Sequence, residues 1–110
     1  MVLNKYHNTK IIIDGIKFDS KKEGNRYKEL KLLEKAGIID NLKLQVPFEV
    51  QPSFKYKNKT IRAITYKADF VYFDNEKNKM IIEDTKGMKT EVYKLKRKMM
   101  MYQGYEIIEI

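Results

Sequence analysis

The chain has 110 residues, of which 43% are hydrophobic and 35% are charged, with a formal net charge of +8 at pH 7. This length is typical of one domain, the composition argues against intrinsic disorder, and no segment approaches the roughly 20 apolar residues of a membrane span. With no cysteine and one histidine, the chain cannot form disulfides, thiolate zinc sites or multi-histidine metal sites, so any metal must be held mainly by oxygen ligands.

The N-terminal part predicts a hairpin followed by a helix. In TKIIIDGIKFDS, two apolar segments surround Asp14-Gly15, a dipeptide suited to the positive backbone angles of a tight turn. Ser20 is a good N-cap, and Glu23 follows it at the spacing of a capping box. A helical apolar stripe comes next, made of Tyr27, Leu30, Leu33 and Ala36. Because a glycine ends this run, we predict a helix over 21–36.

Strands are predicted after this helix. The period of the apolar residues drops toward two, as in the alternating Leu42, Leu44 and Val46. Pro47 and Pro52 should interrupt the first strand pair or place it at a sheet edge. Gln45 and Gln51 flank Pro47 and either line a cleft or are simply solvated. Turn signals at 57–58 and 74–78 divide the remainder into strands near 60–73 and 79–86.

A second helix and a last strand complete the predicted order. Thr90 and Glu91 open the helix and Gly104 stops it, before the final strand YEIIEI. Apolar residues recur at helical spacing in this helix, namely Val92, Leu95, Met99 and Tyr102. Basic residues project from the opposite side, namely Lys94, Arg97 and Lys98. The fold class is therefore α+β or mixed α/β, as a single domain over 1–110 with mostly antiparallel strands and an N-terminal hairpin.

The strong positive charge has two interpretations. A field of this size attracts polyanions, and nucleic acid is the first partner to consider. A lysine-rich surface that only keeps the protein in solution is the alternative. The first ten residues lack the apolar run of a secretion signal, so we expect a soluble, cytoplasmic protein with no membrane contact.

Two acidic residues and a lysine end the apolar segment MIIEDTKGMK. Alternate residues of a strand share a face, so Asp84 and Lys86 point one way and Glu83 points the other. A third carboxylate, Asp69, is embedded among apolar and aromatic residues in YKADFVYFD, although a buried aspartate is uncommon without a partner. These residues form the candidate site.

The hairpin register decides whether the two aspartates meet. If the turn is centred between residues 76 and 77, residues whose numbers add to 153 face one another, and Asp69 lies opposite Asp84 with β-carbons about 5 Å apart. Opposed like charges destabilise a sheet unless a cation lies between them. Lys86 would lie one step farther along the same face.

Two aspartates without histidine or cysteine favour a hard cation. Mg²⁺ typically takes one or two carboxylates, with waters and substrate phosphate oxygens. Such a metal lowers the pKa of a bound water and polarises a phosphoryl oxygen, while a nearby lysine stabilises developing charge or helps to activate the water. This assembly suits phosphodiester hydrolysis. A surface hairpin with ordinary salt bridges is the alternative.

The ordered segments DGIKFDSKKEGNRYKEL, ITYKADFVY and IIEDTKGMKT resemble the PD-(D/E)XK nuclease superfamily. They look most like a group of small phage-encoded proteins of that superfamily, some regarded as Holliday-junction resolvases or related endonucleases. The resemblance runs from about Lys10 to Tyr102. It implies a restriction-endonuclease-like core, in which helices flank a central mixed sheet.

The superfamily motif carries over residue by residue. Its first aspartate matches Asp69, its second acidic residue matches Asp84, and its lysine matches Lys86. Ala68 stands where the proline is usual, and the second acidic position has Asp rather than the commoner Glu, so Glu83 competes for that assignment. Strand parity favours Asp84.

Further residues are implied by the resemblance. The superfamily often adds a glutamate from the first helix to the metal site, and Glu23 matches it, although the capping box alone also explains Glu23. Superfamily members often place basic residues in the helix after the motif. The expected DNA-contacting residues here are Lys89, Lys94, Arg97 and Lys98, and a solvated helix face is the alternative.

These inferences together predict a Mg²⁺-dependent endonuclease that acts on DNA, with Mn²⁺ able to substitute. Branched DNA is the substrate that the resemblance implies, and paired cuts in a junction would require a homodimer. If the protein is phage-encoded, it would act in the host cytoplasm. A catalytically inactive basic nucleic-acid-binding module and a structural partner protein remain the rival hypotheses.

Overall fold

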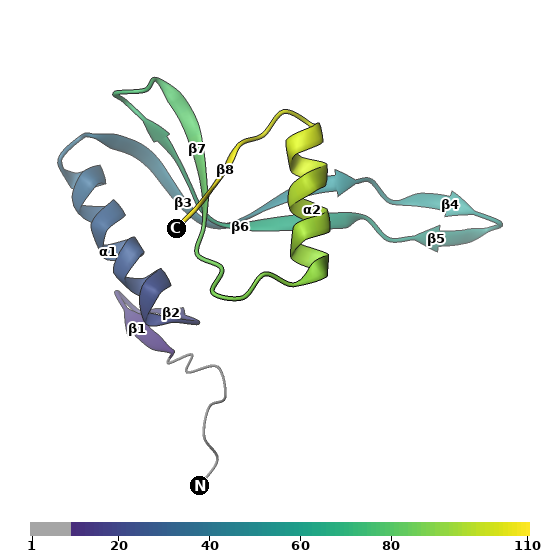
Figure 1. Ribbon diagram of the computed structural model, residues 1–110, viewed down its shortest axis with the longest axis horizontal. Helices are drawn as coiled ribbons and strands as arrows, with labels where there is room; N and C mark the ends of the chain where they lie inside the picture. The colour runs from purple at the N-terminus through teal and green to yellow at the C-terminus, as the bar shows by residue number, and fades with distance from the viewer. Residues whose placement is uncertain (1–9) are drawn as a thin grey trace, which may run out of the picture.

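The computed structural model describes residues 10–110. In chain order the elements are β1 (Ile11–Ile13), β2 (Ile16–Phe18), α1 (Lys21–Lys35), β3 (Ile39–Gln51), β4 (Phe54–Tyr56), β5 (Lys59–Ile61), β6 (Ile64–Asp74), β7 (Lys79–Asp84), α2 (Glu91–Tyr102) and β8 (Ile107–Glu109). The fold is mixed α+β, with a central four-stranded sheet, a helix on each face and an N-terminal hairpin (Figure 1). Neither helix in this part of the chain is long and apolar enough to cross a lipid bilayer.

The central sheet has the strand order β3-β6-β7-β8. The first two pairings are antiparallel, as predicted, whereas β8 runs parallel to β7. Parallel neighbours need a crossover connection, and α2 provides it between β7 and β8. The loop that leaves the end of β7 therefore leads directly into a helix. The predicted candidate residues lie at this end of the sheet.

The core lies on both faces of this sheet. Tyr27 and Leu30 of α1 pack against Phe70, Tyr72 and Ile81 on one face. On the other face, α2 packs against the sheet in a cluster of Tyr93 and Met100 with Tyr66, Ala68, Val71, Ile82 and Ile107. The sheet is thus buried on both sides, as its continuous apolar segments require.

The start of α1 is fixed by a cap and by close packing. Ser20 Oγ accepts a hydrogen bond from Glu23 N at 3.1 Å, which satisfies one of the free N–H groups of the first turn. Gly24 follows in that turn, and a β-carbon there would lie 2.3 Å from Ile11 Cδ1. The hairpin β1-β2 therefore packs directly on the first turn of α1, next to Glu23.

Two strand predictions require correction. The segment predicted near 60–73 is divided: β5 ends at Ile61 and β6 begins at Ile64, so that β4 and β5 form a separate two-stranded sheet. The strand predicted near 79–86 ends at Asp84, because the chain turns away there toward α2. Pro47 lies in the edge strand β3, as predicted, which is where a sheet tolerates proline.

The predicted orientation of α2 is wrong. Of its proposed apolar stripe, Val92 and Leu95 are exposed and Tyr102 is 93% exposed. The helix instead buries Tyr93 and Met100, which are seven residues apart and so lie on one face. The buried Tyr93 hydroxyl needs a hydrogen-bond partner, which the fold supplies in Glu109 at 2.8 Å.

Candidate active site

A row of polar residues crosses the end of the central sheet. In the β6–β7 ladder the partner numbers add to 153, which confirms the predicted register. The last pair of this ladder is Phe70 with Glu83, and Asp69 and Asp84 are the next residue on each strand. In the β3–β6 ladder, Leu44 pairs with Phe70 and Val46 with Ala68, which leaves Gln45 opposite Asp69. Asp84 in turn pairs with Glu109 of β8.

The regular alternation of side chains is broken within this row. Leu44 packs with the core cluster under α1, whereas Val46, two residues later, packs with the cluster under α2. Gln45 between them has φ 52, a left-handed conformation that is uncommon outside glycine. The simple alternation predicted for this strand therefore fails at Gln45, and its side chain is aimed at the carboxylates.

Asp69 is buried and held on both oxygens. Oδ2 accepts hydrogen bonds from Thr85 N at 2.9 Å and from Thr85 Oγ1 at 2.8 Å, and Oδ1 accepts one from Gln45 Nε2 at 3.2 Å. Burial acts to raise the pKa of Asp69, but the Thr85 bonds and the charge of Lys86 outweigh it, so that this pKa lies below its ordinary value. Asp69 is thus an ionised carboxylate in a fixed orientation.

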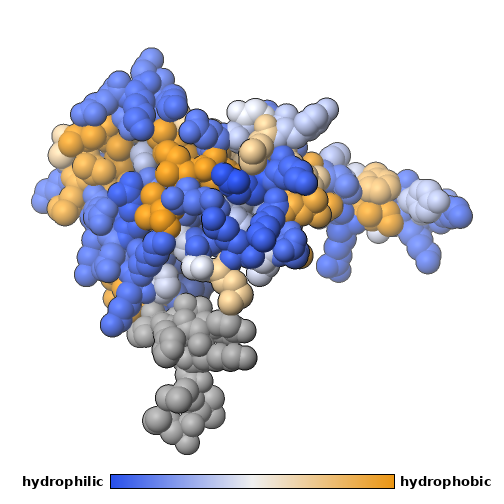
Figure 2. Space-filling model, in the orientation of Figure 1, coloured by the Kyte–Doolittle hydropathy of each residue, from blue (hydrophilic) through white to orange (hydrophobic). Residues whose placement is uncertain are grey.

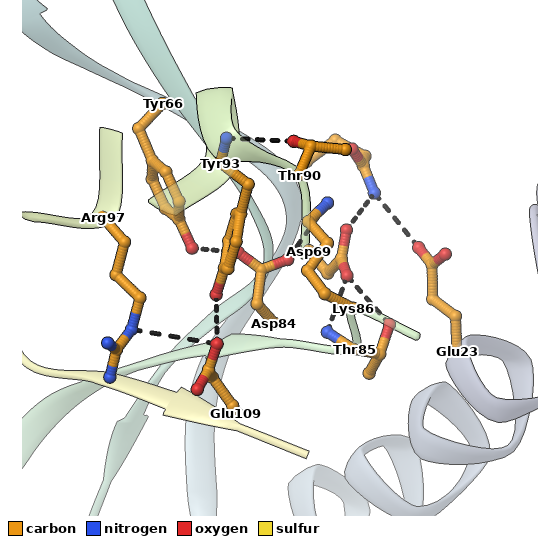
Figure 3. Close-up of polar contacts among 11 residues, drawn as sticks. Glu23, Tyr66, Asp69, Asp84, Thr85, Lys86, Thr90, Tyr93, Arg97 and Glu109 are labelled. Carbon is orange, nitrogen blue, oxygen red and sulfur yellow. Dashed lines mark hydrogen bonds and ion pairs between the residues drawn. The ribbon is translucent and has the colours of Figure 1, made fainter. Parts of the chain in front are cut away.

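Asp84 is fully buried and held on one oxygen only. Its Oδ2 accepts a hydrogen bond from the Tyr66 hydroxyl, while Oδ1 has no hydrogen-bond partner. Burial raises the pKa of Asp84 to about 6; the charge of Asp69 adds to this rise, and the Tyr66 bond opposes it. A buried carboxylate oxygen without a partner is costly, and here it faces a second carboxylate (Figure 3).

Glu23 comes from the first turn of α1 and reaches the same end of the sheet. Its Oε2 accepts a hydrogen bond from Gln45 Nε2 at 3.1 Å, so one amide joins Glu23 and Asp69. Burial raises the pKa of Glu23 to about 7, and the nearby charge of Asp69 contributes. Glu23 therefore donates its backbone N–H to the Ser20 cap and places its carboxyl group in the site, so the two interpretations of Glu23 are compatible.

Lys86 provides the positive charge of the site. Its Nζ lies 3.4 Å from Asp84 Oδ1, the oxygen that lacks a hydrogen bond, and 5.7 Å from the centre of the Tyr93 ring. The side chain is 35% exposed, so the ammonium group lies between the buried carboxylates and solvent. Although β7 ends two residues earlier, the predicted proximity of Lys86 and Asp84 holds.

Glu83 belongs to a different cluster, on the face covered by α1. Arg26 donates to it twice, from Nε to Oε1 at 2.7 Å and from Nη2 to Oε2 at 2.6 Å, and the Tyr72 hydroxyl donates to Oε2 as well. Both oxygens of Glu83 are therefore satisfied inside the protein. Asp84, and not Glu83, therefore lies beside Asp69 and Lys86.

The predicted DNA-contacting residues are mostly engaged within the chain. Lys89 Nζ lies 3.1 Å from Glu109 Oε1, and Arg97 Nε lies 3.9 Å from Glu109 Oε2. Lys94 forms an exposed pair with Glu91 at 3.4 Å, and Lys98 is exposed on the same helix. The Tyr93 bond, together with these two ion pairs, outweighs burial and lowers the pKa of Glu109. Lys89 and Arg97 thus surround the Glu109 end of the polar row.

Several contributors had no signal in the sequence. Tyr66 and Thr85 meet the aspartates only through strand pairing, and Glu109 joins the row only through the parallel pairing of β8. Arg26 had a weak signal, since it follows Glu23 by three positions and so shares its side of α1. Gln45 was a candidate for lining a cleft, but its role between two carboxylates depends on a backbone conformation that its sequence does not predict.

The donor set fits a hard divalent cation. In residues 10–110, no group of three His, Cys, Asp or Glu side chains is arranged to hold one metal ion. Mg²⁺, however, needs only one or two protein carboxylates, and the bare Oδ1 of Asp84 beside the ionised Asp69 offers these. The Gln45 amide bonds to one oxygen of Glu23 and to one oxygen of Asp69, so a metal held by those two atoms would have to displace this amide.

The fold and the site define a mixed α+β domain with a carboxylate cluster and a lysine at one end of its sheet. The model of the family described as "Protein of unknown function (DUF1064)" matches residues 3–109, and the chain belongs to this family. A search of the curated proteins gave no match. A search of the solved structures gave none either.

Proposed function

We propose that the protein is a metal-dependent endonuclease that hydrolyses phosphodiester bonds in DNA. The observation that carries this proposal is the closeness of the buried Asp69 and Asp84 side chains (Figure 3), where Asp84 Oδ1 has no hydrogen bond and faces Lys86. An arrangement that only stabilised the fold would satisfy this oxygen, as the neighbouring Glu83 is satisfied.

Each residue of the cluster has a distinct task in this proposal. Asp69 and Asp84 would hold Mg²⁺, with Mn²⁺ able to substitute, and Glu23 would complete the shell. The bound metal would supply charge neutralisation and a lower pKa for a coordinated water. Thr85 fixes the orientation of Asp69, and Tyr66 fixes that of Asp84. Lys86, at the boundary with solvent, would stabilise charge that develops on the phosphate.

DNA is the proposed substrate because the chain carries a net charge of +8 and its charges attract polyanions. The resemblance to the PD-(D/E)XK superfamily favours branched DNA among the DNA substrates. Two coordinated cuts in a four-way junction would require a homodimer. Lys98 would contact the DNA backbone. The other three expected residues, Lys89, Lys94 and Arg97, would do so after exchanging their present partners for phosphate groups. With this function we propose a cytoplasmic protein, which would act in the host cytoplasm if it is phage-encoded.

The test is cleavage of a labelled four-way junction and of a linear duplex with matched sequence. Each is incubated with wild-type protein and Mg²⁺, with wild-type protein and EDTA, and with the Asp84→Asn variant and Mg²⁺. The proposal expects cutting only in the first case, and preferential cutting of the junction selects a resolvase. Cutting that persists in EDTA or in the variant would overturn it.

A second candidate function is a catalytically inactive nucleic-acid-binding module. The observation in its favour is that no three-residue metal group is formed in residues 10–110, while the Gln45 amide already satisfies oxygens of Glu23 and Asp69. Under this hypothesis the amide replaces the metal. The same assay decides, because this module would bind both DNAs and cut neither with any divalent metal.

A further inference from the structure

The strands β4 and β5 form an arm that stands apart from the domain. They pair only with each other, in a separate two-stranded sheet, and all six of their residues are exposed. Figure 1 shows the arm projecting beyond the end of the central sheet, away from both helices. Because every residue of the two strands is exposed, the arm offers its whole surface to a partner outside its own domain.

The arm is strongly and uniformly basic. Between Pro52 and Ile64 the chain has four cations and no carboxylate, the cations being Lys55, Lys57, Lys59 and Arg62. These four account for half of the net charge of +8. Across the described range 10–110 none of the four forms an ion pair. By contrast, Lys89 and Arg97 near the candidate site are already paired with Glu109.

One face of the arm carries large apolar side chains. Phe54 pairs with Ile61 and Tyr56 pairs with Lys59, and directly opposed residues of an antiparallel pair share a face. Phe54 is 47% exposed and Tyr56 is 59% exposed. The other face carries Lys55, whose Nζ donates to Thr60 Oγ1 at 2.6 Å. Figure 2 shows hydrophobic and hydrophilic residues side by side along this projection.

This combination points to one kind of partner. Lysines bind phosphate oxygens, and apolar or aromatic groups contact sugars and base edges. The major groove of B-DNA, about 12 Å wide, admits a two-stranded β-ribbon. A second copy of the arm would bring four more positive charges and would be repelled. Double-stranded RNA fits poorly, because its major groove is deep and narrow.

We propose that the β4–β5 arm is a second DNA-contacting element that enters the major groove of the duplex on which the candidate site acts, an inference that rests on the proposed function. Asn58 at the tip precedes Asp69 by 11 positions, which corresponds to at most about 36 Å along an extended chain. One turn of B-DNA spans about 34–36 Å. The arm therefore holds the duplex up to one helical turn away from the carboxylate cluster.

The first test measures the salt dependence of binding to a linear 30-base-pair duplex in EDTA, where a metal-dependent enzyme cannot cut. An arm variant changes Lys55, Lys57, Lys59 and Arg62 to Gln. A matched control variant makes four Lys→Gln changes at exposed positions elsewhere, at Lys28, Lys31, Lys35 and Lys77. Both variants have the same net charge. We expect the slope of log K against log salt to fall by about 3 to 4 in the arm variant, and by less than about 1 in the control.

The second test separates groove contact from charge. Tyr56→Ala should weaken duplex binding at least fivefold with an unchanged salt slope, because no phosphate contact is lost. Tyr56→Phe should bind DNA almost like wild type. Circular dichroism and thermal unfolding of each variant show whether the domain is intact, and the exposure of the arm predicts that it is.

The outcomes separate this inference from the proposed nuclease. If the arm variant and the control have equal salt slopes while wild type still cuts DNA, the arm inference is overturned and the nuclease stands. If only the arm variant has a smaller slope of log K against log salt, but wild type cuts nothing with any divalent metal, the arm inference stands and the proposed nuclease is overturned. Wild type that binds no duplex overturns the arm inference, and the nuclease is overturned as well only if neither the junction nor the duplex is cut with any divalent metal. The arm inference is also overturned if the arm contributes equally to the binding of double-stranded RNA. It is likewise overturned if sedimentation shows that the arm variant changes only self-association.

Discussion

Glu83 and Asp84 are neighbours in β7, both are buried, and their surroundings are opposite. Glu83 is held by Arg26 and Tyr72 on the α1 face, with a hydrogen bond to each oxygen. Asp84, on the other side of the strand, has a bare Oδ1 and faces Asp69. The first residue has the arrangement of a structural ion pair, whereas the second keeps one oxygen free of hydrogen bonds, next to Lys86.

The comparison shows how one strand separates stability from activity. Removing a partner of a satisfied buried pair leaves a charge uncompensated, which costs stability. Neutralising Asp84 removes a cost instead, because burial and the nearby charge of Asp69 disfavour its ionised form and raise its pKa. Opposite effects on stability and activity are therefore expected from changes at adjacent positions.

The largest expected effect is on activity. Asp84→Asn should lower the rate of DNA cleavage by about three orders of magnitude or more, or ~4 kcal/mol in the activation free energy. Its melting temperature should equal or exceed that of wild type. Glu83→Gln should show the reverse, with a lower melting temperature and with cleavage retained by the folded protein. A parallel loss of stability in both variants would remove the distinction between the two carboxylates.

The next effect is on stability at the satisfied pair. Arg26→Met should reduce the free energy of unfolding by about 3–5 kcal/mol, because Glu83 stays buried without its main partner. Urea denaturation measures this loss. Glu29→Gln is the control, since Glu29 is the exposed partner of the same arginine, and its change should stay within about 0.5 kcal/mol. Similar losses in the two variants would show that Glu83 does not need Arg26.

Stabilisation by bound metal should distinguish Asp84 from Glu83, with a smaller effect on the free energy of unfolding than the loss of Arg26. Mg²⁺ at a hundred times its dissociation constant should stabilise the wild-type protein by about 2.7 kcal/mol. The stabilisation should disappear in Asp84→Asn and persist in Glu83→Gln, when each melting temperature is measured with Mg²⁺ and with EDTA. A shift that survives Asp84→Asn would place the metal elsewhere.

The smallest effect is the pH dependence of stability without metal. The pKa of Glu23 rises from its ordinary 4.5 to about 7, and that of Asp84 rises from 3.8 to about 6. Between these values the folded protein binds more protons than the unfolded chain, so stability should fall as pH rises from about 4.5 to 7. Denaturation at several pH values measures the slope, and combining Glu23→Gln with Asp84→Asn should flatten it. An upward slope in the wild-type protein over this range would contradict these pKa values.

Much of the fold could be predicted because the signals were local. The Asp14-Gly15 turn, the Ser20 cap and the alternating apolar residues each act over a few positions, and the hairpin, α1 and most strands follow them. The register of β6 against β7, in which partner numbers add to 153, also follows from a local turn, because the two ends of the turn fix the pairing. For the same reason, Asp69, Asp84 and Lys86 could be placed together.

The errors arose where a segment's partner is distant in the sequence. An amphipathic pattern gives the helical spacing of α2, but the face that becomes buried depends on the sheet surface it meets, and Tyr93 and Met100 fit that surface. The division between β5 and β6 likewise depends on where β3 stops pairing with β6, at Gln51 and Ile64.

The sequence by itself determined the elements, the oxygen-only ligand chemistry, the basic charge and the opposition of Asp69 to Asp84, because these depend on composition and on short-range backbone preferences. Only the tertiary structure decided which carboxylates are satisfied. Arg26 reaches Glu83 across 57 positions, and Gln45 reaches Glu23 and Asp69 through a left-handed backbone conformation. Burial and hydrogen bonding are properties of the packed chain, and they separate the structural Glu83 from the candidate site at Asp84.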